Sequence, residues 1–261
     1  MEIIDFHAHI YPDKIAEKAT LSTGEFYGIK PEHIGTADEL LTIGRQAGIS
    51  RFVLLPIATK PEQVRHINDF IVREVYVHEE FYGFGTVHPD CEDLQAEAEN
   101  ILRLGLKGIK LHPDTQGFNI DDERFFEMYD TVQGRLPLLI HCGDRRFDYS
   151  HPRRLKRVID NFPRLKIIAA HLGGWSMFDE AYELLSGTDC YLDISSCSAA
   201  LPPERIGEYI HAYGAERILF GTDFPLWDPV SEVKLLDSLR LTDSELEQIT
   251  SKNAHKILGK H

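Results

Sequence analysis

Two stretches of the sequence decide the fold prediction: Leu136-Pro137-Leu138-Leu139-Ile140-His141 and Leu165-Lys166-Ile167-Ile168-Ala169-Ala170-His171. Each is a short apolar run that ends in a histidine, and the two lie one strand-and-helix repeat apart. Apolar runs without strict alternation of apolar and polar residues are typical of parallel strands that are buried on both faces. The sequence therefore predicts a parallel sheet that is covered on both sides.

Runs of this kind occur eight times, and segments with helical periodicity lie between them. The 261 residues divide into units of about 33, and the total matches the roughly 250 residues of a (β/α)8 barrel. We predict an α/β protein, a (β/α)8 TIM barrel that forms a single domain over residues 1–261. A doubly wound open sheet is the alternative, but its Gly-x-Gly-x-x-Gly turn is missing after the first strand. The predicted strands are Glu2–Phe6, Arg51–Ile57, Phe81–Val87, Leu106–Leu111, Leu136–Ile140, Leu165–Ala170, Cys190–Ile194 and Arg217–Phe220.

Three further segments complete the sequence-based outline. Residues 12–31 are rich in Gly, Lys, Glu and Thr, and we expect a long loop that covers the barrel mouth. Residues 242–258 are expected to form a terminal helical pair. Pro or Asp opens several of the intervening helices, as helix starts require. The predicted helices are Pro61–Glu79, Cys91–Leu104, Asp121–Gln133, Pro152–Asn161 and Pro203–Tyr213.

Composition excludes several classes of function. Lys and Arg number 28 against 42 Asp and Glu, and the net charge of −14 disfavours a nucleic-acid partner. The longest apolar runs, such as 52–58, fall far short of the roughly 20 residues that cross a membrane. The first residues lack the pattern of a secretory signal, and the four cysteines form no Cys-x-x-Cys pair. We predict a cytoplasmic protein with reduced thiols, and a symmetric homo-oligomer is compatible with the sequence.

Ionisable side chains gather where the predicted strands end, which is where barrels of this kind place reactive groups. His7 and His9 share one face of an extended segment, and Asp223 follows the last strand, which neighbours the first in a closed barrel. One such residue alone is more often part of a buried polar network. Several at one mouth predict a metal site, because buried ionisable groups need partners. The histidines at strand ends are His7, His9, His88, His112, His141 and His171.

Four motifs resemble those of the amidohydrolase superfamily: Ile4-Asp5-Phe6-His7-Ala8-His9, Leu139-Ile140-His141, Ala169-Ala170-His171-Leu172-Gly173-Gly174 and Phe220-Gly221-Thr222-Asp223-Phe224-Pro225. They are most similar to its amidohydrolase-related branch, which includes metal-dependent hydrolases and aminocarboxymuconate-semialdehyde decarboxylase-like enzymes. The resemblance implies that His7, His9, His141 and Asp223 ligate one divalent metal. It also implies that His171 is a catalytic imidazole and not necessarily a ligand. Zn²⁺ is the predicted ion, with Mn²⁺, Fe²⁺ or Co²⁺ as alternatives.

Lys110 and His112 alternate along a predicted strand, so both are expected to face the barrel interior. In two-metal members of the superfamily a lysine at this place is carboxylated and bridges the ions. We favour one metal, with Lys110 free to hold a substrate carboxylate, and a second metal if Lys110 is carboxylated. We also predict that a small-molecule substrate, which can bear a carboxylate, contacts Lys110, His112, Arg146, Tyr149 and Trp175. Arg146 could instead only balance acidic neighbours, and Trp175 could only pack beneath a helix.

The expected function is metal-dependent hydrolysis of a small ester, lactone or amide by a metal-activated water. Asp223 would accept the proton of that water, His171 would stabilise the developing oxyanion, and Asp5 would orient a ligand imidazole. The alternative is non-oxidative decarboxylation of an aromatic or enoic acid. Cys142-Gly143 replaces the His-Pro pair of the decarboxylases and favours hydrolysis. A non-catalytic barrel is disfavoured because every position of the ring is present.

Overall fold

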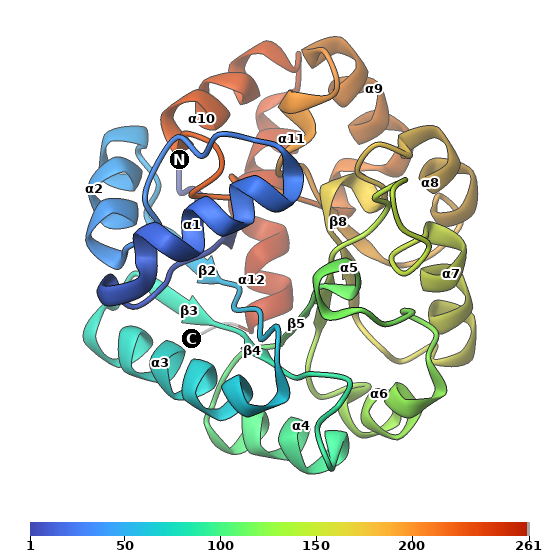
Figure 1. Ribbon diagram of the computed structural model, residues 1–261. Helices are drawn as coiled ribbons and strands as arrows, with labels where there is room; N and C mark the ends of the chain where they lie inside the picture. The colour runs from blue at the N-terminus through green and yellow to red at the C-terminus, as the bar shows by residue number, and fades with distance from the viewer. Residues whose placement is uncertain (260–261) are drawn as a thin grey trace.

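A computed structural model describes residues 1–259, which form a barrel of parallel strands inside a ring of helices (Figure 1). The barrel closes where Phe6 N donates a hydrogen bond to Phe220 O over 2.8 Å. This closure confirms the predicted TIM barrel. The predicted strand Phe81–Val87 is divided into β3 and β4, which share one strand position. The strands are β1 (Ile4–Ala8), β2 (Arg51–Leu54), β3 (Phe81–Gly83), β4 (Gly85–Thr86), β5 (Ile109–Leu111), β6 (Leu138–Ile140), β7 (Ile167–Ala169), β8 (Tyr191–Asp193) and β9 (Ile218–Leu219).

Helices surround the barrel in chain order (Figure 1). Two of them, α7 (Pro152–Asn161) and α9 (Pro203–Tyr213), have the predicted bounds, and each begins with Pro in its first turn. Among residues 1–259, no helix has the length and apolar character that a membrane span requires. The other outer helices are α2 (Ala37–Ala47), α3 (Val64–Val77), α4 (Leu94–Arg103), α6 (Phe126–Val132), α8 (Phe178–Leu185) and α10 (Pro229–Ser238), and short turns occupy Pro61–Gln63, Glu123–Phe125, His171–Gly173, Cys197–Ala199 and Ala215–Arg217.

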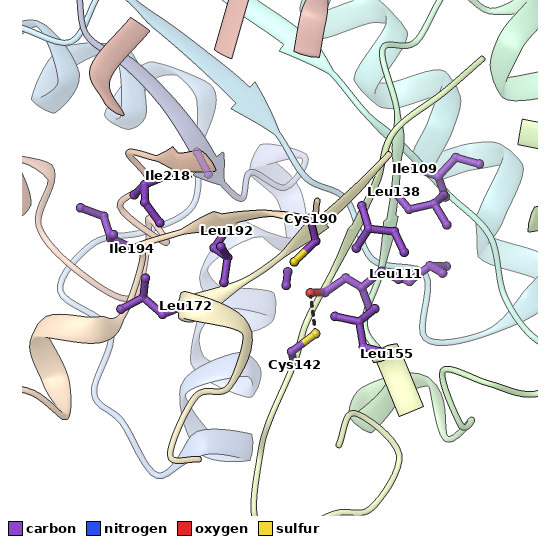
Figure 2. Packing of buried hydrophobic residues seen from close by; sticks show 14 of the residues in the cluster. Ile109, Leu111, Leu138, Cys142, Leu155, Leu172, Cys190, Leu192, Ile194 and Ile218 are labelled. Atoms are coloured by element: carbon purple, nitrogen blue, oxygen red, sulfur yellow. Dashed lines mark hydrogen bonds between the residues drawn. The ribbon is translucent and has the colours of Figure 1, made fainter. Parts of the chain in front are cut away.

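On most strands, the residues that face the helices and those that face the barrel interior belong to separate hydrophobic clusters. On β6, Leu138 and Ile140 face the helices, whereas Leu139 points into the barrel. Figure 2 shows the outer layer, in which Cys142 and Cys190 lie among leucines and isoleucines of neighbouring strands. All four cysteines are free, as predicted. Lys110 pairs in register with Leu139, so its buried side chain occupies an interior position of the barrel.

The segment predicted as a long loop is instead mostly helical. Helix α1 spans Asp13–Tyr27 and ends at Gly28, whose φ of 68° is the left-handed geometry that glycine adopts without strain. Gly24 lets the helix approach the following chain, because a Cβ atom there would lie 2.5 Å from Ile29 O. The glycines and threonines that predicted a loop therefore serve helix packing and helix termination. The segment still lies where we predicted it, because α1 crosses the mouth of the barrel (Figure 1).

The C-terminal segment forms one continuous helical run where we predicted a pair. Helix α11 (Asp243–Glu247) passes through a π-helical turn, Gln248–Lys252, into α12 (Asn253–Leu258). Ala254 and Ile257 pack against the interior cluster of the barrel. Helix α12 thus closes the end opposite α1, and in Figure 1 it lies behind the centre of the barrel.

We predict that Asn253→Ala destabilises the protein by about 1 to 3 kcal/mol. The buried Asn253 amide donates hydrogen bonds to Ala215 O and Ile218 O over 2.8 and 2.7 Å, and the variant leaves both carbonyls without that donor. Urea unfolding measures the change. Lys252→Ala is the control, because the exposed ion pair of Lys252 with Glu247 contributes little. Equal free energies of unfolding for the two variants would contradict a stabilising role for the Asn253 hydrogen bonds.

Candidate active site

The last strand brings Asp223 to the histidines of β1. Asp223 N donates to His7 O over 2.7 Å, and Asp223 Oδ1 lies 3.2 Å from His9 Nε2 and 3.5 Å from His7 Nε2. The three donor atoms lie within 4.8 Å of one another. The structure therefore brings together three of the four residues predicted to bind the metal.

The remaining ring nitrogens of His7 and His9 are held by acceptors. His7 Nδ1 donates to Asp193 Oδ2 over 2.9 Å, and His9 Nδ1 donates to Leu55 O over 2.5 Å. With Nδ1 protonated, each neutral imidazole presents the lone pair of Nε2. The orienting carboxylate of His7 is thus Asp193. Asp5, which we expected in that role, accepts hydrogen bonds from the backbone nitrogens of His7 and Thr222.

The surroundings of His7 keep its imidazole in the neutral form, which is the form that binds a cation. Burial, followed by the charge of Lys110, lowers the pKa of His7 to about 3, so its imidazole is neutral. Two imidazole nitrogens and a carboxylate oxygen converge, and the Lys110 amine lies 3.2 Å from His7 Nε2. A divalent metal ion fits this donor set, because nitrogen and carboxylate ligands of this kind hold such ions in proteins.

His141 lies outside that group of three. Its Nδ1 is 3.1 Å from His171 Nε2, while its Nε2 points to Asp114 Oδ2 at 3.5 Å. His171 Nδ1 donates to Ser195 O over 2.9 Å, so its Nε2 also presents a lone pair towards His141. Burial, followed by the charge of His112, lowers the pKa of His141 well below its usual value. Both imidazoles face each other as predicted, and the role of His141 as a ligand stays a prediction.

Lys110 lies directly beside the donor atoms. Its Nζ is 3.2 Å from His7 Nε2, and the side chain is buried. Burial lowers the pKa of Lys110 to about 8, although Asp193 and Asp223 act to raise it. With this pKa the amine is still mainly a cation at neutral pH, and more of it is the free base than in an ordinary lysine. The ammonium form can hold a substrate oxygen, and the free base can carry a carboxyl group.

A small cavity opens above the site beneath α1. Its lining combines apolar, aromatic and polar side chains and includes Trp175, whose contact with substrate stays a prediction. Tyr27 packs against Trp175 with ring centroids 5.7 Å apart. The cavity is lined by Tyr27, Ile29, His141, His171, Trp175, Ser196, Asp223 and Leu226.

The other predicted substrate contacts lie elsewhere. Arg146 forms an ion pair with Asp144, donates to Phe26 O and stacks on aromatic rings, so it fastens the end of α1. Tyr149 is exposed, with its ring beside Phe147. His112 is buried and stacks on His141 with ring centroids 4.0 Å apart. None of these three predicted contacts is among the residues that line the cavity.

Sequence reasoning missed a pair of serines. Ser195 Oγ donates to Asp193 Oδ1 over 2.5 Å and lies 3.0 Å from His7 Nδ1. Ser196 Oγ donates to Asp223 Oδ2 and accepts from Trp227 Nε1 over 2.8 Å. The sequence marked these two serines as site residues only by their position after a predicted strand. Tyr27 lay in the segment predicted as a loop, where no periodicity marked it.

The pair Cys142-Gly143 has a packing explanation. Gly143 has a φ of 89°, and a Cβ atom there would lie 2.3 Å from Gly174 Cα. Trp175 N donates to Cys142 O over 2.9 Å across the same contact. Glycine is therefore required for two loops to meet, and its presence does not favour hydrolysis.

Residues 4–260 match the family described as amidohydrolase, so the chain belongs to the amidohydrolase family. The 2-amino-3-carboxymuconate-6-semialdehyde decarboxylase of Dictyostelium discoideum is 23% identical over 239 residues, which cover 75% of this chain and 66% of that protein. The chain thus spans about two thirds of the length of this relative. The family and the branch inferred from the motifs are confirmed, and the protein is an enzyme of the amidohydrolase superfamily.

Solved structures show the same fold. An uncharacterised TIM-barrel protein from Bordetella bronchiseptica has a TM-score of 0.81 and 20% identity, covering 99% of this chain and 98% of its own. A 5-carboxyvanillate decarboxylase from Novosphingobium aromaticivorans has a TM-score of 0.78 and 18% identity, covering 98% and 96%. The latter was solved with manganese and 4-hydroxy-3-methoxy-5-nitrobenzoic acid.

We predict that the purified protein, dialysed against Mn²⁺ or Zn²⁺, retains about one ion per chain. His7→Ala should lose that ion, because it removes one of the converging lone pairs. Elemental analysis gives the stoichiometry, and His66→Ala, a change on the outer helix α3, is the control. Two ions per chain would instead indicate a bridging, carboxylated Lys110. A protein that retains no ion would contradict the metal site.

Proposed function

We propose that this enzyme is a metal-dependent carboxy-lyase that removes CO₂ from a small aromatic or enoic acid without oxidation. The observation that carries the proposal is the burial of His171 and Asp223, which are 3% and 6% exposed and line a small cavity together with Trp175 and other residues. Transfer of a carboxylate from water into apolar surroundings destabilises the charged group and favours its loss as neutral CO₂. The relatives named as decarboxylases support this choice over hydrolysis, which our sequence analysis placed first.

In the proposed reaction, the bond between the substrate carbon and its carboxylate breaks, and the electron pair remains on that carbon. The carbon then takes one proton, so RCOO⁻ and H⁺ give RH and CO₂. His171 is the proposed proton donor, because Ser195 O fixes its Nδ1 and the residue lines the cavity. Asp223 would steady the charge of the protonated imidazole.

A bound divalent ion would hold substrate oxygen atoms and withdraw electron density from them. His7, His9 and Asp223 would hold this ion, and the resemblance adds His141. The donor set suits Zn²⁺, whereas the 5-carboxyvanillate decarboxylase was solved with manganese, so both ions belong in the test.

Tyr27 is the proposed donor to the substrate carboxylate. His112 Nδ1 accepts from Thr115 N, so His112 Nε2 donates its hydrogen to the Tyr27 hydroxyl over 2.5 Å. The phenolic hydrogen is therefore left for another acceptor, and Tyr27 lines the cavity. Burial raises its pKa well above the usual value, which keeps this hydrogen in place.

We predict that the Mn²⁺- or Zn²⁺-loaded enzyme releases ¹³CO₂ from a panel of carboxyl-labelled hydroxybenzoates and enoic acids. In D₂O, each product molecule should carry one deuterium at the carbon that lost the carboxylate. ¹³C NMR and mass spectrometry measure both results. His171→Gln should lower kcat at least 100-fold, as expected for loss of a general acid.

A hydrolase would give the opposite pattern. Cleavage of esters, lactones or amides with one ¹⁸O taken from labelled water, and no ¹³CO₂ from any acid in the panel, would refute the proposal and restore hydrolysis.

We predict that Tyr27→Phe raises KM for the carboxylate substrate about tenfold or more, because a hydrogen bond to a charged group contributes about 1.5 to 3 kcal/mol. Steady-state kinetics of the variant measures the change. Tyr76→Phe is the control, since Tyr76 is exposed on α3. An unchanged KM for Tyr27→Phe would remove Tyr27 from the binding site.

A further inference from the structure

Two buried polar atoms near the candidate site have no hydrogen-bond partner among residues 1–259: Asp114 Oδ1 and His141 Nε2. Both side chains are more than nine-tenths buried, with 7% of Asp114 and 3% of His141 exposed. They belong to facing groups, since His141 Nε2 lies 3.5 Å from the other carboxylate oxygen of Asp114. Burial of an unpaired polar atom costs stability, so a pair of them in contact calls for a functional explanation.

We propose that Asp114 is a positioning residue that accepts the Nε2 hydrogen of His141 and thereby leaves the Nδ1 lone pair for the metal centre. A hydrogen bond from His141 Nε2 to the Asp114 carboxylate would give this nitrogen the partner that it lacks. It would also fix the ring, because a histidine that donates from one nitrogen presents a lone pair on the other. The inference rests on the proposed metal-dependent function, in which His141 is a ligand.

Asp114 is itself held firmly in place. It lies on the short helix α5 (Pro113–Gln116), and Ser150 Oγ donates to Asp114 Oδ2 over 2.6 Å. Ser150 Oγ accepts in turn from the backbone nitrogens of Gly143 and Asp144, over 3.2 and 3.3 Å. The loop that follows His141 thus returns to support the carboxylate that faces His141.

The contacts of His141 give this hydrogen bond a consequence. His141 Nδ1 faces His171 Nε2 at 3.1 Å, and His171 Nδ1 already donates to Ser195 O. With the hydrogen of His141 on Nε2, both facing nitrogens carry lone pairs. Such a pair repels unless a proton or a metal ion lies against it. The hydrogen bond to Asp114 would therefore leave two facing nitrogen lone pairs that together bind a cation.

A second cation at His112, Asp114 and His141 is the competing explanation, since their donor atoms also lie within 4.8 Å of one another. The geometry disfavours it. The rings of His112 and His141 are stacked with an interplanar angle of 9°, so their lone pairs run side by side instead of converging. His112 Nε2 is also engaged by the Tyr27 hydroxyl.

The test compares wild type with Asp114→Ala and Asp114→Asn. In metal-free, ¹⁵N-histidine-labelled protein, long-range ¹H–¹⁵N NMR reports the tautomer of His141. We expect the Nε2-protonated form in wild type and its loss in Asp114→Ala. Chelator competition should show Mn²⁺ affinity lowered about 10- to 100-fold in Asp114→Ala. Asp114→Asn should recover part of both, because its amide oxygen can accept the same hydrogen.

Asp121→Asn is the matched control, because Asp121 forms its ion pairs with Arg154 and Arg157 on the outside of the barrel. It should retain the tautomer and the wild-type affinity. Near-ultraviolet circular dichroism verifies that each variant is folded.

Three results would overturn the inference. The first is a His141 protonated at Nδ1 in the wild-type protein, and the second is an unchanged Mn²⁺ affinity in Asp114→Ala. The third is a second bound ion in wild type that Asp114→Ala alone loses. The tautomer is read without metal or substrate. An absence of decarboxylation would therefore refute the proposed function and leave this result standing.

Discussion

The site depends on the convergence of two imidazole nitrogens and a carboxylate at the ends of the first and last strands. His7 and His9 each donate from Nδ1 to a fixed acceptor, so their Nε2 lone pairs meet the Asp223 carboxylate. Such an arrangement needs positive charge nearby, which the Lys110 amine supplies to His7 and a metal ion would supply to all three residues. The barrel stabilises this arrangement, because backbone hydrogen bonds hold β1 beside the end of β9: Phe6 N donates to Phe220 O, and Asp223 N donates to His7 O.

The backbone around this centre is strained in a consistent way. His171, Ser196 and Asp223 have φ values of 57°, 58° and 59°, a region that residues other than glycine seldom occupy. Each of the three follows a barrel strand and turns its side chain into the mouth. Strain of this kind persists where the surrounding structure enforces it and where function uses the resulting orientation. Helix α1 completes the arrangement by covering the mouth with Tyr27.

The sequence predicted the barrel and most of the centre because apolar runs that end in ionisable residues are visible in one dimension. His7, His9 and Asp223 meet as expected, since the first and last strands of a closed barrel are neighbours. Helix α1 was missed because glycine and threonine indicate a loop unless their packing partners are known. Tyr27 was lost with it. Hydrolysis was placed first because the same metal-binding residues serve both reactions, and because Gly143 was taken for a chemical signal when it is a packing requirement.

Anomalous diffraction from crystals soaked in Mn²⁺ tests the central claim most directly, because it locates the ion without reference to any substrate. The account predicts one strong peak within bonding distance of His7 Nε2, His9 Nε2 and an oxygen of Asp223. A peak held instead by His112 and Asp114, or no peak at saturating Mn²⁺, would contradict it.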